Sequence, residues 1–231
     1  MSSYIIGDIH GCQKTTRALI EKVIKPDEND LVIFVGDYID RGPDSKGVVE
    51  YVMELTQKAP FKVIPLRGNH EQMLLDAVHD IQKFKLWMFN HGDVTLASYG
   101  IKPNRNDPAL IFDEFPADHL NFIADMPLFY EGSDFFVVHA GFNFSAPDFL
   151  IDKQAMLWTR DMKVDQDKTN NRPVIHGHTP IDIYEIQNKV SGKAISLNID
   201  NGCKFKEMPG YGHLVAYNPE NRKIYTQPNI D

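Results

Sequence analysis

The chain has 231 residues, and its composition and charge exclude several classes of protein. Hydrophobic residues make up 42% and charged residues 24%, values typical of globular proteins, which excludes disorder or a fibrous architecture for most of the length. The formal net charge is −8, so a broadly basic nucleic-acid-binding protein is not expected. An acidic protein that handles phosphate needs local positive charge, which bound metal ions would supply.

Neither a signal peptide, a membrane segment nor a disulfide framework is predicted. The N-terminus has no basic region followed by a long apolar run, and no apolar run approaches the ~20 residues of a membrane span. Cys12 and Cys203 are far apart in the sequence and lie in no Cys-x-x-Cys motif. A reducing cytoplasm is therefore the predicted location, and neither a membrane nor a nucleic acid is expected as a partner. The sequence does not indicate the oligomeric state.

The first 70 residues repeat a pattern of an apolar run, a polar loop with glycine, and a helical segment. The predicted strands are residues 4–6, 31–35 and 61–66. The predicted helices are residues 13–24, residues 45–57 and a helix from about Gln72. Strands that alternate with helices indicate βαβ units and a sheet that begins parallel. Because ligands bind beyond the carboxyl ends of such strands, the three loops are expected to form one site.

The rest of the chain has a different pattern. Residues 80–125 are rich in aromatic side chains and mostly helical by periodicity, and we expect a helical insertion at the rim of the site. Its aromatic residues are expected to pack in the core rather than to bind substrate. Six short strands are then predicted, at residues 135–138, 173–175, 183–186, 194–199, 212–217 and 223–226. Their close spacing favours a second sheet, mixed or antiparallel. Since no linker is evident, residues 1–231 are predicted to form one domain with an insertion at about 80–126.

Five segments carry residues that bind metals, each in a loop after a predicted strand. They are GDIHG at 7–11, GDYIDRG at 36–42, GNHE at 68–71, HAG at 139–141 and HGHT at 176–179. A single Asp after a strand usually caps a helix, but three such strand ends together favour a shared site. Imidazole with carboxylate ligands suits zinc, iron and manganese, and further oxygen ligands favour manganese and magnesium.

In order and spacing, these segments resemble the phosphoprotein phosphatase family of calcineurin-like metallophosphoesterases, in its short bacterial and phage form. The resemblance extends from Gly7 to about Gly202. Its most specific part is GDYIDRG. If each fixed position matches by chance at a frequency of roughly one in twenty, its five fixed residues would match about once in three million windows. The resemblance implies an α/β fold, a four-layer α-β-β-α sandwich of two mixed sheets flanked by helices.

The resemblance also implies two bound divalent metal ions, manganese by prediction, with iron or zinc as alternatives. The six residues expected to bind them are Asp8, His10, Asp37, Asn69, His139 and His178. Asp8 and His10 would bind the first ion, and Asp37 would bridge both, because a carboxylate offers two oxygens. Asn69 would add a neutral oxygen, which keeps the site positively charged and favours a phosphomonoester dianion over a diester.

Four further residues are expected to act on the substrate. His70 would be the general acid, and Asp40 would orient it. Arg41 and Arg160 would hold phosphate oxygens, together with Asn69; Arg160 ends the short segment LWTR, which resembles a later arginine motif of the family. These residues supply the positioning and charge neutralisation that phosphoryl transfer needs.

One position departs from the wider superfamily. Many metallophosphoesterases have a second histidine two residues after the one that corresponds to His178, and it binds the first metal. Here Pro180 occupies that position, so we expect a weaker first site filled out by water. The departure favours the phosphoprotein phosphatase branch over the diesterases and nucleases. Just before His178, His176 is expected to face the other way if both lie on a strand.

The predicted function is hydrolysis of phosphoserine and phosphothreonine esters, with phosphotyrosine as a further substrate, by direct attack of a hydroxide that bridges the two metals. The partner would be a phosphoprotein or a small phosphoester. The alternative is a symmetrical dinucleoside tetraphosphate (Ap4A) hydrolase on the same framework. Retention of Asp40 favours an ester, because an anhydride leaving group has less need of a proton. The intact ligand set argues against a non-catalytic binding module.

Overall fold

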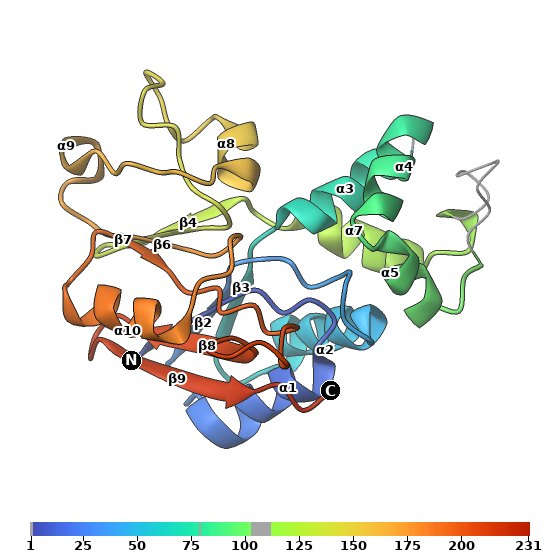
Figure 1. Cartoon of the computed structure of the whole chain (residues 1–231), viewed down its shortest axis with the longest axis horizontal. Helices are drawn as coiled ribbons and strands as arrows, with labels where there is room; N and C mark the ends of the chain where they lie inside the picture. The colour runs from blue at the N-terminus through green and yellow to red at the C-terminus, as the bar shows by residue number, and fades with distance from the viewer. Residues whose placement is uncertain (1, 79, 103–111) are drawn as a thin grey trace.

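The computed structural model describes residues 2–78, 80–102 and 112–231, and two β-sheets lie at its centre (Figure 1). The first sheet has the order β3-β2-β1-β8-β9. Its strands are β1 (Ser3–Ile6), β2 (Leu31–Phe34), β3 (Lys62–Pro65), β8 (His213–Asn218) and β9 (Lys223–Pro228). Strands β1, β2 and β3 are parallel, as predicted, and β8 and β9 are antiparallel to their neighbours.

The second sheet has the order β4-β5-β6-β7. Its strands are β4 (Phe129–Glu131), β5 (Phe136–Val138), β6 (Val174–His176) and β7 (Ser196–Asn198). Strands β5, β6 and β7 are parallel, whereas β4 pairs with β5 in the antiparallel direction. Both sheets are therefore mixed.

Three details of the later strands differ from the predictions. Strands β8 and β9 do not join the second sheet, because β8 pairs with β1 at the register of Ile5 with Tyr217. Strand β4 was not predicted. Residues 183–186 are not a strand but begin helix α10 (Ile183–Ser191), in which Asp182 caps the N-terminus by accepting from the backbone N–H of Tyr184. The β-branched residues there suggested a strand, but the side-chain cap selects the helix.

Alternation along the strands builds the layers. Ile5 of β1 and Val137 of β5 belong to one buried cluster, which fills the space between the two sheets. Their neighbours face away from it: Ile6 belongs to a cluster with residues of the π-helical segment 19–24 and of α2, and Phe136 packs with residues around α8. Side chains of successive strand residues point to opposite faces, which produces this separation. The predicted sandwich of two mixed sheets flanked by helices is confirmed.

Figure 1 shows the helices α3, α4, α5 and α7 gathered on one side of the sheets. The helices are α1 (Gln13–Ala18) with a π-helical continuation at Leu19–Ile24, α2 (Ser45–Lys58), α3 (Asn69–Ala77), α4 (Ile81–Phe89), α5 (Gly92–Ser98), α7 (Ala117–Asp125), α8 (Lys153–Trp158), α9 (Gln166–Thr169) and α10. In the predicted insertion at about 80–126, the described residues include the helices α4, α5 and α7, and residues 103–111 lie outside the described part. Helix α3 begins at Asn69, three residues before the predicted start.

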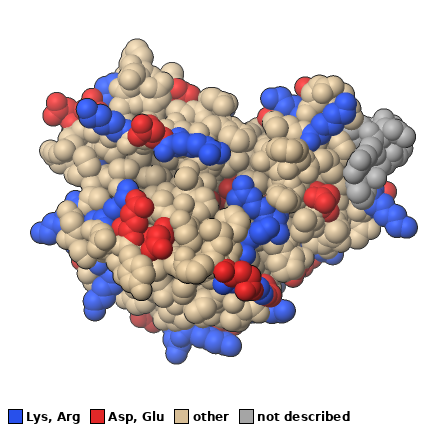
Figure 2. All heavy atoms as spheres, viewed as in Figure 1, with Lys and Arg blue, Asp and Glu red and all other residues tan. Residues whose placement is uncertain are grey.

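Figure 2 shows acidic and basic side chains interspersed over the face in view. Among the described residues, every helix is too short or too polar to cross a membrane.

Candidate active site

The candidate site lies where the loops after β1, β2 and β3 meet. The loops after β2 and β3 touch through their backbones, since a Cβ on Gly36 would lie 2.5 Å from the backbone N of Gly68, and Gly36 has φ +116°. Only glycine fits such a position. Five predicted site residues themselves have positive φ, between 48° and 77°: His10, Asp37, Asp40, Arg41 and His178. Strained backbone of this kind is concentrated at functional sites.

One group of four side chains is arranged as a cation would require. The Nε2 atom of His139 lies 2.8 Å from Asn69 Oδ1, 3.2 Å from His178 Nδ1 and 3.5 Å from Asp37 Oδ1. The Nδ1–H of His139 is directed to the carbonyl of Val35 at 3.1 Å, so Nε2 carries a lone pair. Lone pairs on nitrogen and oxygen therefore face one another across this small space, and a cation at its centre would satisfy all of them.

A second group shares Asp37. The Nδ1–H of His10 is directed to the carbonyl of Ile39 at 2.9 Å, which turns its Nε2 lone pair toward Asp37 Oδ2 at 3.5 Å. The Nε2 atom of His70 lies 4.0 Å from the same oxygen. His10, Asp37 and His70 can thus present three ligand atoms to one ion. The guanidinium of Arg41 provides positive charge here, because its Nη1 donates to His10 Nε2 at 2.7 Å.

Asp8, predicted to bind the first metal, lies beside these groups but belongs to neither compact set among the described residues. Both of its oxygens accept from the backbone N–H of His178, at 3.1 and 3.2 Å. Burial, followed by the charges of Asp200 and Asp37, raises the pKa of Asp8 well above its usual value. Asp8 therefore links the loop after β1 to the loop after β6.

The predicted acid and its orienting residue are in contact. His70 Nδ1 lies 2.6 Å from Asp40 Oδ2, and both side chains are fully buried. Burial lowers the pKa of His70, but the charges of Asp37 and Asp40 outweigh it, so the pKa is raised above its ordinary value. The Nε2 atom of His70 has no hydrogen-bond partner among the described residues. A protonated His70 held in this way has one N–H left to donate.

The two predicted phosphate-binding arginines differ in position. Arg41 is half-buried and contacts His10, as described above. Arg160 is exposed, and it lies near enough to His178 to help lower the pKa of that imidazole, which burial and His139 bring to about 3. The described geometry brings Arg41 into the centre of the site and places Arg160 at its rim.

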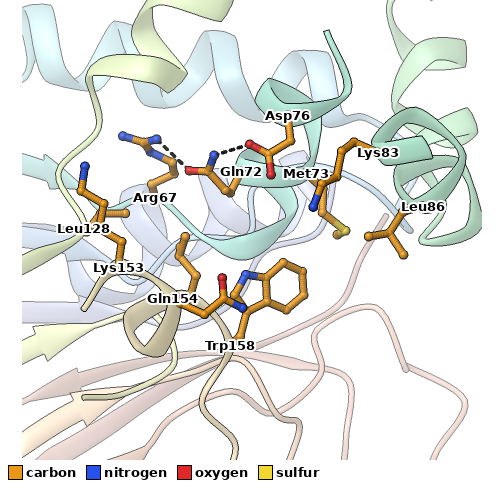
Figure 3. Close-up of a pocket in the computed structure, with 11 residues that line it drawn as sticks. Arg67, Gln72, Met73, Asp76, Lys83, Leu86, Leu128, Lys153, Gln154 and Trp158 are labelled. Carbon is orange, nitrogen blue, oxygen red and sulfur yellow. Dashed lines mark hydrogen bonds between the residues drawn. The ribbon is translucent and has the colours of Figure 1, made fainter. Parts of the chain in front are cut away.

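A cavity of about 560 Å³ adjoins the site between α3, α4 and α8 (Figure 3). Trp158 lines it and connects it to the site, because its ring centroid lies 6.3 Å from that of His178. Arg67, Lys83 and Lys153 give the lining an excess of positive charge over Asp76. The cavity therefore suits an anionic group next to the candidate ligands.

His176, Asp200 and the two cysteines make contacts typical of structural residues. His176 bonds through Nε2 to Ser196 Oγ at 3.1 Å. Asp200 accepts from the backbone N–H of Gly202 at 2.7 Å, in a turn near the site. Cys12 and Cys203 are both buried as free thiols.

Sequence reasoning missed the role of Glu71, the last residue of the GNHE segment. One oxygen of this buried carboxylate accepts from the backbone N–H groups of Tyr38 and Ile39, and the other from those of Asp37 and Gly68, at 2.8 to 3.2 Å. Glu71 thereby ties the loop after β2 to the start of α3. The signal was its place as the third residue of that helix, where a Glu can accept from the capping N–H.

We expect Glu71→Gln to lower the free energy of unfolding by about 2 to 4 kcal/mol, because two of the four N–H groups would then face an amide NH₂, and a buried unsatisfied donor costs about 1–3 kcal/mol. Urea denaturation at about pH 8 measures the change. The matched control is Glu28→Gln, an exposed residue, which should leave the stability unchanged. Equal stability of the two variants would contradict this role.

Binding of a divalent cation should release protons from carboxylates rather than from the imidazoles of His139 and His178. Burial raises the pKa of Asp200 to about 7, and burial with Asp37 raises that of Glu71 to about 7, whereas His139 and His178 have lowered pKa values and are already neutral. A cation favours the ionised carboxylates, so the affinity should rise with pH through about 7.

Calorimetric titration with Mn²⁺ in buffers of different ionisation enthalpy counts the released protons. We expect more protons at about pH 6.5 than at about pH 8.5, and fewer at the lower pH in Asp200→Asn than in the exposed control Asp134→Asn. Proton release that does not change with pH would refute the assignment.

Comparison with known proteins agrees with this geometry. Residues 1–216 match the model of the calcineurin-like phosphoesterase family. Serine/threonine-protein phosphatase 1 of Salmonella typhimurium is 41% identical over 90 residues, which is 39% of this chain and 38% of that protein. The symmetrical bis(5'-nucleosyl)-tetraphosphatase of Photorhabdus laumondii is 40% identical over 85 residues, 37% of this chain and 30% of that protein. The alignments thus span well under half of these relatives.

Solved structures show the same fold. The protein serine/threonine phosphatase from Saccharomyces cerevisiae with similarity to human phosphatase PP5 superposes with a TM-score of 0.67 at 16% identity, covering 100% of this chain and 81% of that one. The family match over residues 1–216 includes all five motif segments. The chain is therefore a member of the calcineurin-like phosphoesterase family, as its motifs predicted.

Proposed function

We propose that this protein is a two-metal phosphomonoesterase that hydrolyses phosphoserine and phosphothreonine esters, with phosphotyrosine as a further substrate. The observation that carries the proposal is the buried contact of 2.6 Å between His70 Nδ1 and Asp40 Oδ2, next to the shared carboxylate of Asp37. The alkoxide of serine or threonine is a poor leaving group and needs a proton as it departs. A histidine oriented by a carboxylate is the arrangement that supplies one.

The candidate ligands suit two divalent cations. Asn69, His139 and His178 would hold one with Asp37, and Asp8 and His10 would hold the other with the second oxygen of Asp37. Cations bound there would supply the activation of a water molecule as the nucleophile and would neutralise the charge of the phosphate. Mixed nitrogen and oxygen donors without cysteine favour Mn²⁺, with iron or zinc as alternatives. A location in the cytoplasm and the single-domain organisation stay predictions.

The chain's own residues would perform the other tasks. His70 would donate the proton on Nε2 to the leaving oxygen while Asp40 holds its Nδ1. Arg41 would turn from His10 to bind a phosphate oxygen, and Arg160 would approach from the rim, with Asn69 beside them. Guanidinium groups suit this role because two of their N–H groups can bind two phosphate oxygens at once.

Symmetrical Ap4A hydrolysis is the second candidate, and two observations favour it. Several relatives of about 40% identity are named symmetrical bis(5'-nucleosyl)-tetraphosphatases. The cavity beside His178 also carries Arg67, Lys83 and Lys153, which would suit the further phosphates of a polyphosphate chain (Figure 3). Against it stands the Asp40–His70 contact, because a phosphoanhydride leaving group needs a proton less than an alkoxide does.

The test compares substrates on one metal-stripped preparation, with and without added Mn²⁺. The substrates are p-nitrophenyl phosphate, a phosphoserine peptide and diadenosine tetraphosphate. We expect monoester hydrolysis that appears only with metal, and a kcat/KM for the phosphopeptide above that for the dinucleotide. Rapid cleavage of the dinucleotide with little monoester turnover would replace this proposal with the second candidate.

A further inference from the structure

The acid's orienting carboxylate is held by the helical insertion. The Oγ1–H of Thr95 donates to Asp40 Oδ1 at 2.5 Å, and the indole Nε1–H of Trp87 donates to both oxygens of Asp40 at 3.0 and 3.1 Å. Trp87 lies on α4 and Thr95 on α5, and both are fully buried. Two residues of the helical insertion thus contact a carboxylate that belongs to the loop after β2.

These contacts leave Asp40 one orientation. The Oδ1 atom accepts from Thr95 and Trp87, and the Oδ2 atom accepts from Trp87 and faces His70 Nδ1 at 2.6 Å. The backbone N–H of Asp40 donates to Thr95 Oγ1 at 2.9 Å, so the same hydroxyl holds both ends of the residue. A buried carboxylate that is satisfied on every side has a fixed plane, and that plane determines the direction of the imidazole.

Packing alone does not require these polar atoms. Trp87 packs edge-on against Phe84 and in a tilted arrangement against Phe112, at ring-centroid distances of 6.2 and 6.3 Å, so a phenylalanine at 87 would keep most of the apolar contact. A valine at 95 would likewise fill the space of the threonine. What such residues would lack is the donor that points at Asp40.

We propose that Trp87 and Thr95 are positioning residues for the general acid, so that the insertion helices α4 and α5 set the geometry of proton transfer to the leaving group. The inference rests on the proposed function for its catalytic consequence. Neither residue touches the substrate; both act through Asp40 on His70. Their loss should therefore matter in proportion to how much the leaving group needs a proton.

Kinetics with two leaving groups tests this. Trp87→Phe and Thr95→Val should each lower kcat about 10-fold for a phosphoserine peptide but less than about 2-fold for p-nitrophenyl phosphate, whose phenolate leaves easily, with KM little changed. Thr95→Ser keeps the hydroxyl and should restore most of the peptide activity. Phe84→Leu is the matched control, because it removes packing beside Trp87 without touching Asp40, and it should lower both rates equally or not at all. Equal losses on both substrates, or no rescue by serine, would overturn the proposal.

A second measurement is independent of substrate. The Nδ1–H proton of His70, bonded to a carboxylate at 2.6 Å, should give a resolved downfield proton resonance, assigned by its loss in Asp40→Asn. It should shift or broaden in Trp87→Phe and Thr95→Val and remain in place in Thr95→Ser and Phe84→Leu. If the wild-type protein hydrolysed no monoester, the proposed function would fail while this resonance still tested the positioning. An unchanged resonance in Trp87→Phe and Thr95→Val would overturn the proposal that these two residues position His70.

Discussion

Asp37→Asn is expected to abolish phosphoesterase activity, lowering kcat/KM for p-nitrophenyl phosphate by at least about 10³-fold. Asp37 is the one residue shared by the two ligand groups: Oδ2 faces His10 Nε2 and Oδ1 faces His139 Nε2, each at 3.5 Å. An amide keeps one oxygen and places an NH₂ where the other stood, which puts a donor against a cation. Cation binding should weaken at both groups, and with it the charge neutralisation on which phosphoryl transfer depends.

The substitution is suited to separating chemistry from folding. Asp37 has φ 53°, and asparagine is among the residues that adopt this left-handed conformation most readily, so the backbone should be retained. Metal titration by calorimetry measures cation binding, and thermal unfolding without metal measures the stability of the fold. Asp134→Asn, on an exposed loop, is the matched control. Two sites of wild-type affinity in Asp37→Asn would contradict the bridging role.

His70→Asn is the second large effect, a fall of about 10² to 10⁴ in kcat for a phosphoserine peptide, the usual contribution of a general acid. The structure allows His70 two roles, because its Nε2 lies 4.0 Å from Asp37 Oδ2 and could also serve a metal in the group with His10. The contact with Asp40 and the raised pKa favour the acid, since a ligand must be unprotonated.

Metal titration separates the two roles. An acid can be removed without changing cation binding, whereas removal of a ligand weakens one site. His70→Asn should bind Mn²⁺ as the wild type does and should keep more activity on p-nitrophenyl phosphate than on the peptide. His119→Asn, a buried histidine of α7 that bonds to Tyr99, controls for the loss of an imidazole. Loss of one metal site in His70→Asn would reassign His70 as a ligand.

Local patterns were sufficient to predict the part of the fold that bears the motifs. The strands before Asp8 and Asp37 and the helices at 13–24 and 45–57 follow from short apolar runs and helical periodicity, and the structure confirms them within a residue or two. The errors have two sources, one local and one tertiary. The assignment of 183–186 as a strand overlooked the cap at Asp182, and no local pattern shows that β8 returns to pair with β1.

The motifs indicated several residues that the structure brings together, but not the residues that support them. The motifs place Asp37, His70 and His139 in loops after strands, and the structure brings these loops together. The contacts of Asp40 with Trp87 and Thr95 join positions 47 and 55 residues apart, through helices whose own sequence shows only apolar periodicity. The spacing of residues in the sequence cannot reveal which carboxylate a buried indole N–H or hydroxyl contacts.

The pairing of β1 with β8 also affects how the chain folds during its synthesis. The backbone N–H of Gly7, the residue before Asp8, donates to the carbonyl of Val215 at 3.0 Å, so the first motif is anchored by a strand made more than 200 residues later. At a synthesis rate of about 5–20 residues per second, β1 waits roughly 10 to 40 seconds with one edge unpaired. During that interval an exposed strand edge can recruit another chain, and closing so long a loop is slow. The first motif is therefore anchored only after β8 has been synthesised, late in the production of the chain.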